Sequence, residues 1–233
     1  MTSKSPSRRS ALAMTLAALT AALISPLASA QSWPSKPLKL VVPFPPGGAT
    51  DTVARLIAER LALRLGQPVI IDNKPGASTV IGVDAVAKST PDGHTLLVSG
   101  ASSFTVVPAL RSKLPFDMLK DLSPIALVAH APLVLVTASV KPYLRLADVV
   151  AQAKAKPKLL TYSTYGPGSS PHLSGELLAY AAGVELEPVP YKGSAEALMG
   201  VMRGDVDVGV ETLSAASAHI KAEIGRASCR ERV

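Results

Sequence analysis

Short apolar runs alternate with helical patterns along most of this chain, and that alternation constrains the possible fold more than any other feature. The run Leu38–Phe44 is typical of a buried strand, and Thr50–Leu65 places its apolar residues on one helical face. Repeated strand–loop–helix units predict a parallel sheet with helices on its faces. Because 48% of the residues are hydrophobic and only 18% are charged, such an α/β fold can bury a substantial core.

The alternation continues through the rest of the chain. The further expected strands are Pro68–Asp72, Thr95–Ser99, Lys158–Thr164, Leu186–Tyr191 and Val206–Glu211. The further expected helices are Val80–Lys88, Leu146–Ala155, one that ends at Gly183, and Ser194–Arg203. Between the two halves, Leu122–Val140 is a long, β-rich, nearly uncharged run that predicts a passage between two sheets. We therefore expect two α/β lobes, residues 31–128 and residues 129–223.

Residues 1–30 have the three parts of a secretory signal. These are the basic residues Lys4, Arg8 and Arg9, the apolar stretch Ala11–Ile24, and the small residues Ala28–Ala30. The apolar stretch is too short to span a bilayer, and the small residues predict cleavage after Ala30. We expect an exported protein that does not itself span the membrane, with Sec and twin-arginine export both left open.

The last ten residues, Ile224–Val233, match the in-frame translation of a short-read sequencing adapter at every codon. We therefore expect the natural chain to continue past Glu223 with other residues, and the sole cysteine, Cys229, to lie outside it. The net charge of +7 includes +3 from the signal and +2 from this tail, which leaves +2 for residues 31–223. A body this close to neutral lacks the basic stripe that nucleic-acid binding requires.

Loops rich in glycine, proline and small polar residues follow the strands. "PFPPGGATD" joins the first strand to the first helix, which Thr50 or Asp51 can cap. The first N–H groups of a helix have no internal partner, and the helix dipole attracts anions. Four similar loops are Asn73–Thr79, Ser99–Ser103, Tyr165–His172 and Pro190–Glu196. Because ligands bind at the carboxyl ends of parallel strands, the loops predict a cleft of amides, hydroxyls and one lysine that suits a carboxylate.

Two common enzyme motifs are absent from the sequence. It contains neither a G-x-S-x-G elbow nor a G-x-x-x-x-G-K-[ST] loop. Ser169 and Ser170 lie near His172, but no acid is spaced to orient that histidine. The four histidines are scattered without the spacing of metal ligands. We expect no catalytic residue, no metal and no cofactor.

Taken together, several segments resemble the Bug-type substrate-binding proteins of tripartite tricarboxylate transporters. They are "PFPPGGATDTVARLIAERL", "IIDNKPGAS", "PDGHTLL", "LPFDMLKDLSPIALVA", "LTYSTYGPGSSPHLSGELL" and "VPYKGSAEALMGVMRGDVDVG". The resemblance runs from about Trp33 to Glu223 and implies a type II periplasmic-binding-protein fold, with two α/β lobes around a ligand cleft. Members of that family are longer, which implies that lobe 1 lacks its C-terminal return segment and that lobe 2 is partial.

The resemblance also implies which residues hold a carboxylate. One lobe supplies Pro46, Gly47, Gly48, Thr50 and Asp51, and the other supplies Gly166, Gly168, Ser169, Ser170 and His172. The further lining residues are Ala77, Ser78, Ser102, Ser103, Tyr191 and Lys192. Two departures stand out: Ser78 and Thr79 occupy the place of a usual glycine, and Glu211 that of a common aspartate.

The implied function is that of a monomeric periplasmic receptor without catalysis. It binds a small carboxylate and docks on the permease subunits of the inner membrane. A stand-alone periplasmic sensor for a two-component system uses the same kind of cleft, so it remains the alternative. Neighbouring permease genes favour transport, and a neighbouring kinase gene favours sensing.

Overall fold

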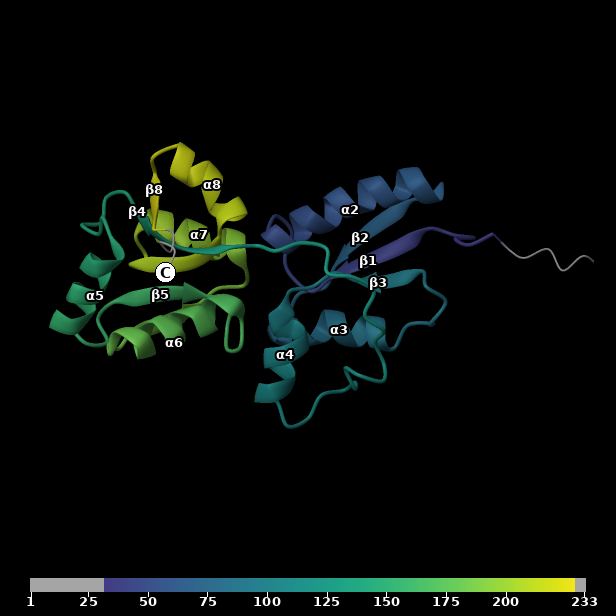
Figure 1. Cartoon of the computed structure of the whole chain (residues 1–233), viewed down its shortest axis with the longest axis horizontal. Coiled ribbons are helices and arrows are strands. Elements are labelled where there is room, and N and C mark those ends of the chain that lie inside the picture. The colour runs from purple at the N-terminus through teal and green to yellow at the C-terminus, as the bar shows by residue number, and fades with distance from the viewer. Residues whose placement is uncertain (1–31, 229–233) are drawn as a thin grey trace, which may run out of the picture. The chain divides into compact units, whose positions relative to one another are not determined.

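The computed structural model describes residues 32–228, and Figure 1 shows how its helices and strands are arranged. The signal expected for residues 1–30 lies outside the described residues, as does Cys229 with the rest of the C-terminal end. Lys36–Ser228 lie within one compact unit. Two sheets with helices on their faces make up this unit, so the α/β class expected from the sequence is confirmed.

The first sheet consists of three parallel strands in the order β2-β1-β3. They are β1 (Leu38–Val42), β2 (Val69–Asn73) and β3 (Thr95–Leu97). Helix α2 (Ala49–Leu65) packs on β1 and β2, while α3 (Val80–Ala87) packs on β1 and β3 from the other side (Figure 1). Because helices cover both faces of the central strand, β1 is buried almost throughout rather than alternately.

The second sheet is mixed and has the order β6-β5-β7-β4-β8. Its strands are β4 (Leu133–Ala138), β5 (Thr161–Thr164), β6 (Glu187–Pro190), β7 (Val208–Thr212) and β8 (Gly225–Ser228). Its helices are α5 (Leu146–Ala155), α6 (Ser170–Ala182), α7 (Ser194–Arg203) and α8 (Leu213–Lys221). Strand β5 runs parallel to β6 and β7, whereas β4 is antiparallel to both β7 and β8.

Side chains of β4 alternate between two cores on opposite faces of this sheet. Val134 and Val136 pack with Leu198 and Val201 of α7. Leu135 packs on the other cluster, which contains Tyr162 of β5. Successive side chains of a strand point to opposite faces of its sheet, so β4 contributes to the cores on both faces.

Several expected elements differ from the observed ones. Within the run Leu122–Val140 only β4 is a strand, and residues 123–133 are exposed. Pro124 and Pro132 remove N–H donors from that run, so the passage between the sheets is irregular rather than β. The sequence also did not predict α8, β8, or the helix α4 (Ala101–Leu110), which begins within the expected loop Ser99–Ser103. The lobe boundary after residue 128 and the adapter origin of the tail stay predictions.

Among residues 32–228, no helix combines the length and the apolar character that a membrane span needs.

Asp207 anchors the beginning of β7 to neighbouring segments. Its carboxylate accepts hydrogen bonds from Lys141 Nζ at 2.8 Å and from the backbone N–H and hydroxyl of Thr161, both at 3.0 Å. Burial acts to raise the pKa of Asp207, but the bonds from Lys141 and Thr161 outweigh it and lower that pKa below its ordinary value. The interaction therefore stabilises the protein at neutral pH and is lost as the pH falls through the lowered pKa.

We expect Asp207→Asn to lower the free energy of unfolding by about 1–2 kcal/mol at neutral pH. The difference from the wild type should shrink in urea titrations between about pH 5 and pH 2, where the wild-type carboxylate itself becomes protonated. Asp205→Asn is the matched control, because Asp205 is exposed and its carboxylate pairs with the nearby Arg203 side chain. A difference of equal size at pH 2 and pH 7 would contradict this assignment.

Candidate functional site

The loop after β1 leads into a helix start that no side chain caps. Gly48 is the N-cap residue of α2, and Gly47 before it adopts a left-handed φ of 86°. The expectation that Thr50 or Asp51 caps this helix is wrong, because both lie inside its first turn. The first N–H groups of α2 are therefore left for another partner. Pro46 and Gly47 are exposed at this end.

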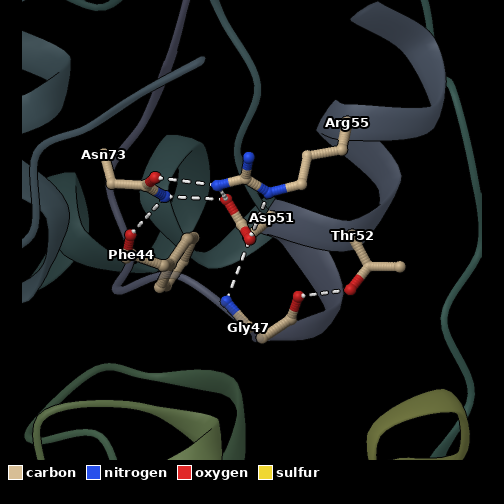
Figure 2. A network of polar contacts seen from close by, with 7 residues as sticks. Phe44, Gly47, Asp51, Thr52, Arg55 and Asn73 are labelled. Atoms are coloured by element: carbon tan, nitrogen blue, oxygen red, sulfur yellow. Dashed lines mark hydrogen bonds and ion pairs between the residues drawn. The ribbon is translucent and has the colours of Figure 1, made fainter. Parts of the chain in front are cut away.

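Asp51 holds this loop in place from within (Figure 2). One carboxylate oxygen accepts the Gly47 N–H and the Arg55 Nε–H, both at 2.9 Å. The other accepts Asn73 Nδ2 at 2.9 Å, and the same nitrogen donates to the Phe44 carbonyl at 3.1 Å. The network thus ties both ends of the loop to β2.

The Asp51 carboxylate is charged but neutralised. Only 2% of the residue is exposed. Burial acts to raise the pKa of Asp51, yet the hydrogen bonds from Arg55, Gly47 and Asn73 lower it below the ordinary value. Since Arg55 compensates the charge and the donors occupy both oxygens, Asp51 shapes the loop instead of repelling an anion bound nearby.

The start of α7 lies against the start of α2. A Cβ atom placed on Gly193 would come within 3.0 Å of the Pro45 ring, and one placed on Gly48 would lie 3.6 Å from Ser194 Cβ. Gly193 is the N-cap residue of α7 and, like Gly48, provides no side-chain cap. Two uncapped helix N-termini therefore meet, and their dipoles together favour a negative charge between them. The Lys192 side chain is exposed beside them, and the backbone N–H of Lys192 donates to the Glu196 carboxylate at 2.9 Å.

The glycine loop before α6 contacts a third helix. A Cβ on Gly168 would lie 3.0 Å from Leu110 Cδ1 of α4. Ser169 caps α6 by accepting the His172 N–H at 3.4 Å, and its hydroxyl donates to the Gly166 carbonyl at 2.8 Å. Ser170 begins this helix and is half-buried. The Ser169 hydroxyl is therefore committed to the loop itself.

The predicted lining serines of the first lobe lie in a helix. Ser102 and Ser103 are buried in the first turn of α4, whose N-cap is Gly100. The Ser103 hydroxyl is hydrogen-bonded to that of Ser99 at 2.7 Å. Helix α4 thus adds a third uncapped N-terminus among the loops that follow the strands.

The segment after β2 is strained. Ala77, Ser78 and Thr79 form a short 3-10 turn with φ values of 49°, 56° and 80°. A left-handed conformation is especially unfavourable for a β-branched residue, and the buried Thr79 hydroxyl has no hydrogen-bond partner among the described residues. Serine and threonine at positions 78 and 79, where the family usually has a glycine, therefore strain the backbone of this segment.

We expect Thr79→Gly to raise the free energy of unfolding by about 1 kcal/mol, because glycine tolerates this backbone and removes the unpaired hydroxyl. Thr105→Gly in α4 is the control, since there glycine should destabilise the helix by about 1 kcal/mol. Chemical denaturation of both variants measures the two shifts. A loss of stability in Thr79→Gly similar to that in the control would show that the strain is not relieved.

A buried carboxyl group at the end of β7, hydrogen-bonded to two hydroxyl groups, adjoins the start of α7. Glu211 is fully buried, and one of its carboxyl oxygens accepts the hydroxyl groups of Tyr165 at 2.5 Å and Ser194 at 2.7 Å. Burial raises the pKa of Glu211 to about 7, although these two hydrogen bonds act in the opposite direction. The pKa of the Tyr165 hydroxyl is also raised, chiefly by burial and to a smaller extent by the nearby Glu211 carboxyl group. The sequence did not identify this cluster as part of the site.

A hollow of about 460 Å³ lies away from these loops, among the helices of the second sheet. It lies beside the C-terminal ends of α5 and α6, where Lys154, Tyr180 and Glu185 contribute to its walls. Helix C-termini carry partial negative charge, so this position disfavours a carboxylate. Within residues 32–228 no cluster of three or more His, Cys, Asp or Glu side chains could hold a metal ion.

Comparison with known proteins identifies the family of this chain. Residues 53–228 match the family model TctC, described as tripartite tricarboxylate transporter family receptor. The chain belongs to this receptor family. Among curated relatives of this TctC-family chain, BugT of Bordetella pertussis is 41% identical over 206 residues, which are 87% of this chain and 62% of BugT.

Solved structures of similar proteins share the fold. Rpa4515 of Rhodopseudomonas palustris with adipate has a TM-score of 0.81 and 35% identity, over 84% of this chain and 65% of that chain. MatC of the same organism with bound malate has a TM-score of 0.79 and 32% identity, over 86% and 69%. The TctC-family chain thus has the periplasmic-binding-protein-like α/β fold and spans about three fifths of the length of the curated relatives that it matches.

The structure brings together only some of the residues predicted for the site of this TctC-family chain. Gly48 and the α2 start meet the α7 start, and the Gly168 loop meets α4. The Tyr191 ring, by contrast, packs on the core beneath α7, with its hydroxyl against Gly200, so it does not line the loops. Missing from the prediction were Tyr165, Ser194 and Glu211, which no spacing in the sequence distinguishes.

Proposed function

We propose that this protein is a periplasmic receptor that binds a small carboxylate where the starts of α2 and α7 meet. The observation that carries the proposal is the pair of uncapped helix N-termini in contact, formed by Gly48 and Gly193. Backbone N–H groups there can satisfy a carboxylate without any basic side chain. Membership of the receptor family and the adipate and malate ligands of two structural neighbours support the choice of ligand class.

Each part of the site has a distinct task in this proposal. The Asp51 network holds the first loop, so that little conformational entropy is lost when the ligand binds. The second lobe supplies the start of α7 and the Gly166–Ser169 loop. A ligand that touches both lobes stabilises the conformation in which they meet. The loaded receptor then delivers the acid to membrane permease subunits.

Thermal unfolding in the presence of small acids tests the binding step. Adipate and malate are the first probes, with the neutral diamide of adipate and the diamine putrescine as matched controls. At a ligand concentration near 100 times Kd, binding stabilises the folded protein by about 2.7 kcal/mol, which raises the melting temperature. Stabilisation by the diamine or the diamide, but by none of a broad panel of carboxylates, would refute the proposed ligand class.

Uptake measurements test the delivery step. A strain without the receptor gene should lose uptake of the radiolabelled acid that binds most tightly, and the wild-type gene should restore it. Unchanged uptake, with loss of a transcriptional response to the same acid, would instead establish the sensor function.

A further inference from the structure

The buried acid at the end of β7 has one oxygen without a partner. Glu211 Oε2 accepts both Tyr165 and Ser194, whereas Oε1 is buried and makes no hydrogen bond to any described residue. A buried carboxyl oxygen without a partner is unfavourable, so native proteins normally provide one. The pairing of β7 with β4 involves the backbone of Glu211 and not its side chain, so it does not supply a partner for Oε1.

The position of Glu211 connects this oxygen to the proposed site. Strands β5 and β7 are parallel, and Glu211 lies near the carboxyl end of β7, the end at which ligands bind in such sheets. Its partner Ser194 is the first residue of α7 and lies against Gly48. Glu211 is thus separated by one side chain from the contact between the two helix starts.

We propose, building on the function above, that protonated Glu211 donates a hydrogen bond from Oε1 to a carboxylate oxygen of the ligand. The two hydroxyl donors on Oε2 leave Oε1 as the oxygen that carries the proton. A neutral carboxyl group adds a donor without adding further negative charge beside an anion bound at the positive ends of α2 and α7. The raised pKa of about 7, caused chiefly by burial, is consistent with this protonation state.

Within residues 32–228, the side-chain hydrogen bonds to Glu211 come from two hydroxyl groups, and not from charged side chains of the neighbouring helices. Tyr165 and Ser194 are the side chains that hydrogen-bond to it, and the nearby Thr212 N–H favours its charged form. The charged or titratable residues of α6, α7 and α8 include His172, Glu176, Glu196, Arg203, His219 and Lys221. None of these six hydrogen-bonds to Glu211 in the part of the chain that the structure describes. The Glu176 carboxylate instead accepts a hydrogen bond from the Tyr162 hydroxyl, and the Glu196 carboxylate accepts one from the backbone N–H of Lys192.

Isothermal titration of the full-length protein with adipate between pH 6 and pH 9 tests the proposal. Both adipate carboxyl groups are essentially ionised in this range, so the ligand contributes little to the pH dependence. We expect Kd to rise about tenfold per pH unit once the pH exceeds the pKa of Glu211. Glu211→Gln keeps a neutral donor, and its Kd should therefore stay nearly constant and be lower than that of the wild type at pH 9. Glu187→Gln, at an exposed carboxylate of β6, is the matched control and should keep the wild-type profile.

The outcomes separate this inference from the proposed function. Carboxylate binding that is equally strong from pH 6 to pH 9 would overturn the role of Glu211 and leave the receptor function intact. Affinity that increases with pH would also overturn it, because an ionised Glu211 would then accept a hydrogen bond from a ligand donor such as an ammonium group. The absence of binding by any carboxylate at any pH would refute the proposed function, and this inference with it.

Discussion

Replacing Asp51 by alanine is expected to lower the free energy of unfolding by about 2–3 kcal/mol, because several donors lose a charged acceptor that is almost fully buried. The variant removes the carboxylate that accepts the Gly47 N–H and the Asn73 amide, and it leaves Arg55 with only its long contact to Asn73 within this network (Figure 2). Since the free energy of unfolding of a domain is about 5–15 kcal/mol, the variant should still fold. Urea unfolding measures this loss.

The same variant should also bind carboxylates at least about tenfold more weakly, because the loop before α2 loses its tether and must be ordered by the ligand. Asn73→Ala distinguishes tethering from direct contact, because Asn73 holds Phe44 and Asp51 from β2. It should weaken binding in the same direction. Asp84→Ala is the control, since the half-buried Asp84 and the exposed Lys88 form an i,i+4 ion pair of equal spacing in α3, away from the loop before α2. Unchanged affinity in Asp51→Ala would remove the network from the account of the site.

Replacing Gly175 by alanine should destabilise the protein by about 2–3 kcal/mol through overpacking, although alanine favours helices by about 1 kcal/mol. A Cβ at this position of α6 would lie 2.1 Å from a ring carbon of Tyr162. That ring is 1% exposed, and its hydroxyl donates to Glu176 at 2.7 Å, so it cannot move aside easily. Thermal and urea unfolding measure the effect.

A double-mutant cycle provides the control for this clash. In a Tyr162→Leu background the ring is absent, so Gly175→Ala should be neutral or slightly stabilising. If the substitution costs the same in both backgrounds, the close approach of α6 to β5 is not its cause.

The sequence predicted helices closely where apolar periodicity and a terminating residue indicated the same bounds. Helices α5 and α7 have the bounds expected from their periodicity, and Gly183 ends α6 as expected. Helix α4 was missed because it begins in a serine-rich, loop-like stretch and contains Pro108. In the folded protein α4 packs against α3 and the 3-10 turn Ala77–Thr79, contacts that the local sequence does not reveal.

The candidate site was predicted less completely, for a physical reason. The glycine loops could be recognised from their composition, but the partners that arrange them come from distant parts of the chain. Asn73 reaches Asp51 across 22 residues, and Tyr165 reaches Glu211 across 46. Nothing local distinguishes Glu211 from an exposed glutamate at a strand end, because its burial is a property of the folded sheet. Such contacts become visible only when the topology is known.

A crystal structure of the full-length protein with adipate tests the central claim most directly. We predict one adipate carboxylate within about 2.7–3.2 Å of backbone nitrogen atoms in the first turns of α2 and α7, the range of N–H···O hydrogen bonds. Adipate bound instead in the hollow beside the C-terminal ends of α5 and α6, with the two helix starts unoccupied, would contradict the claim.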